Sequence, residues 1–181
     1  MSWEIGRHDW SLLRAAGSAS GIPRAIMSLQ SAISVNDATA AYWQIDNTVT
    51  VQGAVYEAAL AAASCLLVSL VSCTEAARPQ ILELLVQIGA GEPADVEVEA
   101  GNFNIVPACL EEIARGVPIF VSVLERSHSS DERSSCVDLL GLCCRVDSSL
   151  RARVKSYFET VKVAGASDGL LALLESWAEE L

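Results

Sequence analysis

The sequence predicts an all-α protein, an α-solenoid made of stacked pairs of helices. Half of its 181 residues (51%) are hydrophobic but only 6% are aromatic, so the apolar mass is mostly Ala, Leu, Val and Ile. Ala and Leu are among the best helix formers, because they lose little side-chain entropy in a helix. Only five prolines interrupt the chain. A recurring helix-start pattern is the third observation that favours helices throughout.

That pattern is a residue suited to the N-cap of a helix, followed by an acid in the first turn. The cap oxygen accepts an unpaired backbone N–H, and the acid complements the positive end of the helix dipole. The intervals between successive occurrences are 38, 56 and 37 residues, which is the period of a two-helix repeat with one insertion. The four occurrences are Asn36-Asp37, Thr74-Glu75, Ser130-Asp131 and Ser167-Asp168.

Four helix pairs follow from these starts, in one domain that covers residues 1–181, with an N-terminal cap in residues 1–20. The Gly-Val-Pro sequence at 116–118 predicts a kink in the third pair. One helix pair cannot bury its own apolar stripe, so neighbouring pairs must stack to form a core. The predicted pairs are 22–34 with 37–47, 50–72 with 75–89, 103–127 with 131–145, and 148–163 with 168–179.

An acidic insertion loop interrupts the repeat at residues 92–102. Two valines, Val96 and Val98, alternate with acids there, so a short extended arm is one interpretation. A flexible, solvated connector is the other. Loops of this length inside compact domains are often functional, which makes the insertion a candidate binding element.

The charge balance narrows the class of partner. Twelve basic residues stand against 23 acidic ones, a formal net charge of −11. A nucleic-acid binder needs Lys and Arg to displace phosphate counterions, and an anionic membrane surface makes the same demand. We therefore expect neither partner. The excess suits a cationic protein surface, although acidic proteins are also simply soluble.

The uncharged run 58–74 is the only segment that suggests a membrane span, at the short edge of spanning length. It is rich in Ala and Ser, with Glu57 just before it and Glu75 just after. A helix buried on nearly all sides explains this composition better. The first ten residues carry Glu4, Arg7 and Asp9 and have no apolar core of a signal peptide, so we expect a cytoplasmic protein.

The six cysteines predict reduced, buried thiols. No pair has C-x-x-C spacing, and the two histidines, His8 and His128, lie far from any paired cysteines. Structural zinc is therefore not expected, nor any other metal or cofactor. Each cysteine stands among aliphatic residues, where a thiol behaves as a small hydrophobe. The six are Cys65, Cys73, Cys109, Cys136, Cys143 and Cys144.

No pattern of catalytic residues is evident, so the sequence predicts a protein that is not an enzyme. The run Gly17-Ser18-Ala19-Ser20-Gly21 has alanine where a nucleophile elbow needs serine. The zinc-protease, phosphate-loop and EF-hand spacings do not occur.

The pairs themselves resemble a known family. An aliphatic first helix, a turn with Asp or Asn, an early basic residue (Arg78, Arg133) and a closing Leu-Leu resemble HEAT repeats. The resemblance is clearest over 116–145 and weaker over about 20–165; Arg78-Pro79 departs from it. It implies a right-handed superhelix of about four HEAT-like pairs, with the second helix of each pair on the concave face.

The stretches 41–47 and 51–59 are also similar to bacterial HEAT-type proteins associated with polymorphic-toxin loci. Small acidic proteins of that kind can be immunity partners. The resemblance therefore implies a bacterial immunity protein that occludes a basic toxin domain. The alternative is a scaffold or adaptor without inhibitory role. A third interpretation, a HEAT-type enzyme like the phycobilin lyases, would need a reactive cysteine at a groove.

Candidate binding residues fall into three groups. Acids recur at similar distances after the predicted caps (Asp46, Glu83, Asp138 and Glu175), which predicts an acidic ridge on the second helices. Aromatic residues gather near the first pair; Trp43 is expected in the core, and Tyr42 is open between core and interface. With the insertion, the predicted partner-binding set is Tyr42, Asp46, Asn47, Tyr56, Glu83, Glu92, Asp95, Glu97, Glu99, Asn102 and Asp138.

Overall fold

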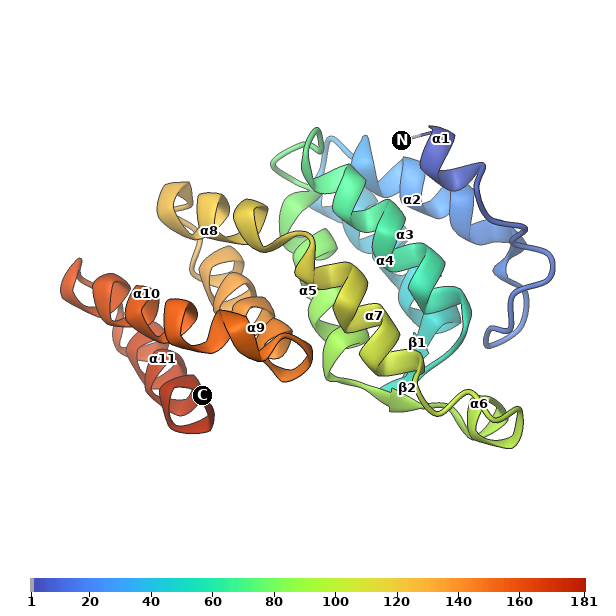
Figure 1. Cartoon of the computed structure of the whole chain (residues 1–181). Coiled ribbons are helices and arrows are strands. Elements are labelled where there is room, and N and C mark those ends of the chain that lie inside the picture. The colour runs from blue at the N-terminus through green and yellow to red at the C-terminus, as the bar shows by residue number, and fades with distance from the viewer. Residues whose placement is uncertain (1) are drawn as a thin grey trace.

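Helices dominate the computed structural model, which describes residues 2–181 (Figure 1). Three strands of two residues each form one small sheet among them: β1 (Thr50–Val51), β2 (Ala54–Val55) and β3 (Glu92–Pro93). The α-helices are α1 (Ser2–Ile5), α2 (Ile22–Gln30), α3 (Val35–Val49), α4 (Ala58–Leu70), α5 (Arg78–Ala90), α6 (Asp95–Glu99), α7 (Ile105–Ala114), α8 (Val117–Arg126), α9 (Ser130–Val146), α10 (Arg151–Val163) and α11 (Asp168–Glu180). The all-α prediction is confirmed.

Most of the long helices lie in two rows. In the first row, which we call the A row, α2 packs against α4 and α4 against α7. In the B row, α3 packs against α5, α5 against α9, and α9 against α11. Contacts of α2 with α3, α4 with α5, and α7 and α8 with α9 join the rows (Figure 1). The hydrophobic core lies between them, because each helix buries its apolar side against the facing row.

The uncharged run at 58–74 is a buried helix for most of its length, as predicted. Eleven of the thirteen residues of α4 are buried, because α2, α5, α7 and α1 surround it. Small alanines such as Ala59 and Ala62 allow these neighbours to approach closely. No helix within residues 2–181 has the length and apolar character needed to cross a bilayer.

The helix starts lie close to the predicted caps but not always on them. Ser34 caps α3, so Asn36 lies inside the helix, and Ser129 rather than Ser130 caps α9. Ser167 is the N-cap residue of α11, as predicted. Thr74 has a different role: its hydroxyl donates to the Ala32 carbonyl and accepts from the Ala77 N–H, four residues before α5 begins. The pattern located the helices to within a few residues.

The predicted helix 50–72 is wrong over its first eight residues. Residues 50–55 form a hairpin in which β1 pairs antiparallel with β2, Thr50 opposite Val55. Its two turn residues, Gln52 and Gly53, have φ of 51° and 82°, the left-handed region that a type I′ turn requires at both positions. Glycine accepts that conformation without strain, and it stands at the second of the two positions.

The insertion is ordered, and neither an extended arm nor a loop. Its first residues form β3, which pairs parallel with β2 and places Glu92 opposite Ala54. Residues 95–99 then form the short helix α6. Val96 and Val98, which suggested a strand, lie on that helix with both side chains partly exposed.

The predicted kink in the third pair is a complete break. α7 ends at Ala114 and α8 begins at Val117, with Pro118 in its first turn, where its missing N–H costs no hydrogen bond. The two helices pack on the same partner, α9. Within the predicted cap at 1–20, of which the structure describes residues 2–20, α1 packs on α4, and Trp10 and Ala19 are buried in the core.

Candidate partner-binding face

Three predicted acids lie on adjacent helices of the B row. Asp46 is on α3, Glu83 on α5 and Asp138 on α9, and each is half-buried. Asp46 accepts a hydrogen bond from the Thr50 hydroxyl (3.0 Å), and Glu83 accepts one from the Gln87 amide (2.7 Å). Each carboxylate is therefore held in place by a neighbour one helical turn away.

Tyr42 connects the first two of these acids. It lies on α3 one turn before Asp46, and its ring is buried. Burial first, and then the negative charges of Asp46 and Glu83, together raise the pKa of Tyr42 to about 12. Both carboxylates thus lie near one phenol, on helices α3 and α5 that pack against each other.

Asp138 continues this region onto α9. Burial raises the pKa of its carboxyl group, and the negative charge of Glu83 adds to that effect. The opposing influence is a hydrogen bond from the indole Nε1–H of Trp177 to Asp138 Oδ1 (2.8 Å), which favours the ionised form. We call the row Asp46, Glu83 and Asp138 the acidic ridge.

The row of acids does not continue onto α11. The Arg145 guanidinium lies over the Trp177 ring, 5.2 Å from its centroid, and pairs with Glu180 (Nε to Oε1, 2.8 Å). A cation therefore lies over Trp177, the hydrogen-bond partner of Asp138, at the end of the row that the spacing predicted a fourth acid to extend. Glu175, that predicted fourth member, is an exposed residue of α11.

Two members of the predicted set, Glu97 and Asn102, lie in an internal network instead. Glu97 is fully buried and accepts from Arg14 Nη2 (2.8 Å) and Nε (3.1 Å). It also accepts from the Glu57 backbone N–H (2.9 Å) and from the Asn102 amide (2.8 Å). These four donors use the carboxylate within the chain, which removes Glu97 from the accessible surface. Sequence reasoning missed Arg14, because no local pattern links it to a residue in the insertion.

The other insertion acids remain at the surface. Glu92, Asp95 and Glu99 are exposed. A shallow hollow of about 600 Å³ lies between the β1–β2 hairpin and the start of α6, and Tyr56, Glu92 and Asp95 are among its lining residues. The structure therefore brings these three predicted residues together at one end of the molecule.

Trp43 was expected in the core, and that expectation is wrong. Its side chain is 51% exposed, whereas its neighbour Tyr42 is buried. The two rings contact edge to face, with centroids 5.0 Å apart. Trp43 and Asn47, one turn apart on α3, line a second hollow together with Ser18 and Ile22. An exposed indole held by an aromatic neighbour is a suitable interface anchor.

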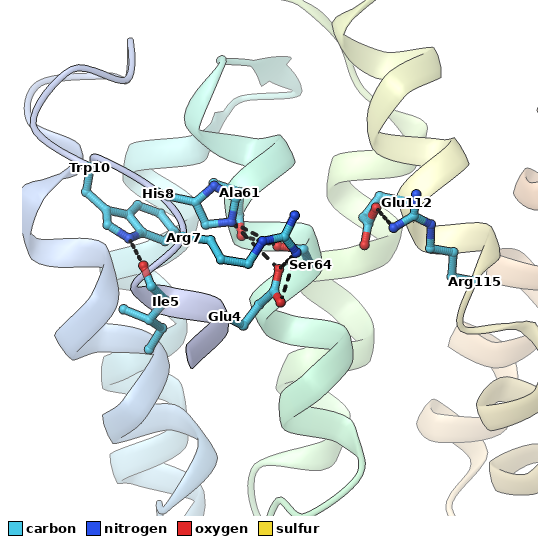
Figure 2. A network of polar contacts seen from close by, with 9 residues as sticks. All are labelled: Glu4, Ile5, Arg7, His8, Trp10, Ala61, Ser64, Glu112 and Arg115. Atoms are coloured by element: carbon cyan, nitrogen blue, oxygen red, sulfur yellow. Dashed lines mark hydrogen bonds and ion pairs between the residues drawn. The ribbon is translucent and has the colours of Figure 1, made fainter. Parts of the chain in front are cut away.

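A serine, a histidine and a glutamate meet near the N-terminus, but not as a catalytic triad (Figure 2). The Ser64 hydroxyl lies 3.3 Å from His8 Nε2 and donates to the Ala61 carbonyl (3.0 Å). Glu4 Oε1 lies 3.8 Å from that same nitrogen. A triad needs the carboxylate on the opposite ring nitrogen from the hydroxyl. The arrangement instead attaches α1 to α4.

The thiols are also held in a protonated, unreactive form. All six cysteines are free, and five are buried. Burial is the main cause that raises the pKa of every one, to about 12 for Cys109, Cys136 and Cys143. Within residues 2–181, no group of three or more His, Cys, Asp or Glu side chains is arranged to hold a metal ion.

Comparisons with known proteins give no relative: no family model, no curated protein and no solved structure matches the chain. Function is therefore inferred from the chain's own residues.

Proposed function

We propose that the chain is a stoichiometric protein-binding module whose acidic ridge binds a cationic surface of another protein. In the same proposal the two rows of helices are a right-handed, HEAT-like solenoid with the B row on its concave side. The exposed insertion acids Glu92, Asp95 and Glu99, with Tyr56, extend the binding surface at one end. Trp43 and Asn47 supply an aromatic contact beside the ridge.

The observation that carries the proposal is the contiguity of Asp46, Glu83 and Asp138 across three helices. Their charges act on shared neighbours: Asp46 and Glu83 both raise the pKa of Tyr42, and Glu83 raises that of Asp138. No basic side chain forms an ion pair with any of the three within residues 2–181. Unpaired carboxylates held side by side repel one another, and a cationic partner would relieve that repulsion.

Binding on such a face works through steering and occlusion. The net charge of −11 attracts a basic partner over several ångströms, which raises the association rate. Contact with Trp43 and Tyr56 then slows dissociation, because aromatic side chains bury much area with few rotatable bonds. Neither step requires a chemical reaction catalysed by this chain.

The physiological act we propose is neutralisation of a bacterial toxin domain in the cytoplasm. The sequence resemblance to HEAT-type immunity proteins and the unpaired acids support it. Reduced thiols fit that compartment. An adaptor that binds a basic partner without inhibiting it would use the same residues, so only the partner's activity distinguishes the two.

The test is capture from the native organism on the immobilised chain, at low and then high salt, with mass spectrometry of the retained proteins. The double variant Asp46→Lys with Glu83→Lys reverses two charges of the ridge. Its matched control, Glu75→Lys with Glu111→Lys, reverses two exposed charges away from the ridge. We expect the unmodified chain to retain one basic protein at low salt and to release it at high salt. The control variant should retain the same protein at low salt, and the ridge variant should not.

The captured protein is then assayed alone and with an equimolar amount of the chain. Loss of its activity supports neutralisation, and full activity in the complex supports the adaptor. A partner that binds the ridge variant as tightly as the unmodified chain would disprove binding through the ridge.

A further inference from the structure

A second surface, formed mainly by α1, the end of α4, the end of α7 and α8, combines exposed apolar side chains with arginines. A groove runs past the C-terminal end of α4 and along α8. One part of it is lined by Trp3, Val68, Val71 and Ile119. The adjoining part shares Val71 and Ile119 and continues to Val123. Because the two parts share these side chains, they form one continuous groove. We call it the arginine groove, after the four arginines that also line it.

Two apolar side chains of this groove are open to solvent, and Val68, Ile119 and Val123 are half-buried beneath them. Val71, at the C-cap of α4, is 74% exposed, and Trp3, on the short helix α1, is 63% exposed. Water-exposed side chains of this size, gathered on one strip, favour a partner that covers them.

The charge of the groove is opposite to that of the whole chain. Four arginines line it, with two glutamates, in a protein whose net charge is −11. Arg78 and Arg126 are at the α8 part, and Arg7 and Arg115 at the α1 part. Arg126 forms no ion pair with another residue of 2–181. Arg78 Nη1 lies 3.7 Å from the carboxylate of the buried Glu132, so the unpaired positive charge of the groove is that of Arg126.

Figure 2 shows how the arginines at the α1 part are held. Arg7 pairs with Glu4 on one side of α4 (Nη1 to Oε1, 2.9 Å), and Arg115 pairs with Glu112 on the other (Nη1 to Oε2, 2.8 Å). Each pair uses one nitrogen of a guanidinium that has five N–H donors. Both arginines are exposed, so they retain donors for the carboxylates of a partner.

We propose that the arginine groove binds an acidic, amphipathic helix of a partner protein. The apolar side of such a helix would cover Val71 and Ile119, and acids on its flanks would meet Arg115 and Arg126. Helices bind grooves in this way through apolar anchors at spacings of three and four residues. A nucleic acid fits poorly, because its backbone offers no row of aliphatic side chains to cover Val71 and Ile119. This inference is independent of the proposed function, since it concerns different residues and a partner of opposite charge.

The test uses a fluorescent peptide of about 18 residues, long enough to form a helix, with leucines on one side and glutamates on both flanks. A second peptide keeps the leucines and replaces every glutamate with lysine. Binding of each to the full chain is measured by fluorescence anisotropy. We expect the acidic peptide to bind at least ten times more tightly than the basic one.

Two pairs of chain variants locate the site. Arg115→Glu with Arg126→Glu should weaken binding of the acidic peptide about tenfold or more, while Arg24→Glu, an exposed arginine of α2 outside the groove, should not. Val71→Asp should also weaken it about tenfold, while Val163→Asp, at a position 89% exposed on α10, should not. Such exposed positions tolerate the change without loss of the fold.

The proposal is overturned by any of three results. The basic peptide binds as well as the acidic one, the groove variants bind like their controls, or the acidic peptide does not bind at concentrations up to about 1 mM, the range of very weak complexes.

Discussion

The Arg14 guanidinium and the Glu97 carboxylate, 83 residues apart in the chain, form a two-pronged ion pair through Nη2 (2.8 Å) and Nε (3.1 Å). Arg14 Nη1 also lies 3.3 Å from the Glu57 carboxylate. One side chain thus joins the N-terminal segment, the start of α4 and the insertion. The pair orients α6, and with it the exposed acids on either side of Glu97.

Replacement of Arg14 by alanine should destabilise the protein by about 3 kcal/mol, because it leaves the Glu97 charge buried without its cation. Urea denaturation followed by circular dichroism measures this. Arg115→Ala, which removes an exposed partner of Glu112, should cost about 1 kcal/mol or less. Equal losses of stability in the two variants would show that the buried Arg14–Glu97 pair stabilises the protein no more than the exposed Arg115–Glu112 pair.

The same pair predicts a dependence of stability on pH. Burial raises the pKa of Glu97, but hydrogen bonds from Arg14, Asn102 and the Glu57 N–H outweigh it, so the pKa lies below the ordinary 4.5. A lowered pKa in the folded state gives stability that is complete above the unfolded value and is lost as pH falls through the folded value.

Glu97→Gln should therefore be destabilised at neutral pH but lose less further stability than the unmodified chain as pH falls below about 4.5. Urea midpoints at several pH values measure the difference. Glu99→Gln, on the exposed side of α6, should keep the unmodified pH dependence. A Glu97→Gln curve parallel to the unmodified one would contradict the prediction.

The contact between α9 and α11 predicts a steric effect at Gly141. A Cβ at this position would lie 2.2 Å from the Trp177 ring, so Gly141→Ala should destabilise the protein by about 1–3 kcal/mol. The control is Gly169→Ala in α11, where no atom lies within 4 Å of the added Cβ. That change should be neutral or stabilise by up to about 1 kcal/mol. Thermal denaturation of both variants decides whether the helices pack this closely.

The acidic ridge predicts a measurable coupling between Glu83 and Asp138. Burial first, and the Glu83 charge second, raise the pKa of Asp138, while the Trp177 indole N–H lowers it. Glu83→Gln should therefore lower the pKa of Asp138, and Trp177→Phe should raise it. Carbon-detected NMR titration of the carboxyl groups measures both shifts. Glu111→Gln, on α7, should leave the value unchanged; a response to this control, or none to Glu83→Gln, would argue against a contiguous ridge.

The buried thiols predict slow alkylation. Burial raises the pKa of all six cysteines, to about 11 for Cys65, so little reactive thiolate exists at neutral pH. Iodoacetamide should modify Cys73, the one half-buried thiol, first and the other five only on unfolding in urea. Mass spectrometry counts the modified sites. One rapidly labelled thiol in the folded chain would revive the interpretation as an enzyme with a reactive cysteine.

The sequence by itself determined the helices. Ala- and Leu-rich segments with N-cap residues such as Ser167 specify helices through interactions within a few residues, so a pattern in the chain is enough to find them. It also placed Asp46, Glu83 and Asp138 on three helices that turn out to be neighbours, although they lie 12, 6 and 9 residues after the N-cap residues of those helices and not at one common distance. The sequence failed where the first two turns of the predicted helix 50–72 are a hairpin, since Gln52-Gly53 alone did not show that a strand at Glu92 would pair with it.

Tertiary structure decided which of the predicted binding residues remain accessible. Glu97 and Glu99 are both acids of one short helix, yet only Glu97 faces Arg14 and is buried. Trp43 and Tyr42 are adjacent aromatics, yet only Tyr42 turns toward the core. The orientation of a helix about its axis depends on all of its packing partners, many of them distant in sequence, and local patterns do not record it.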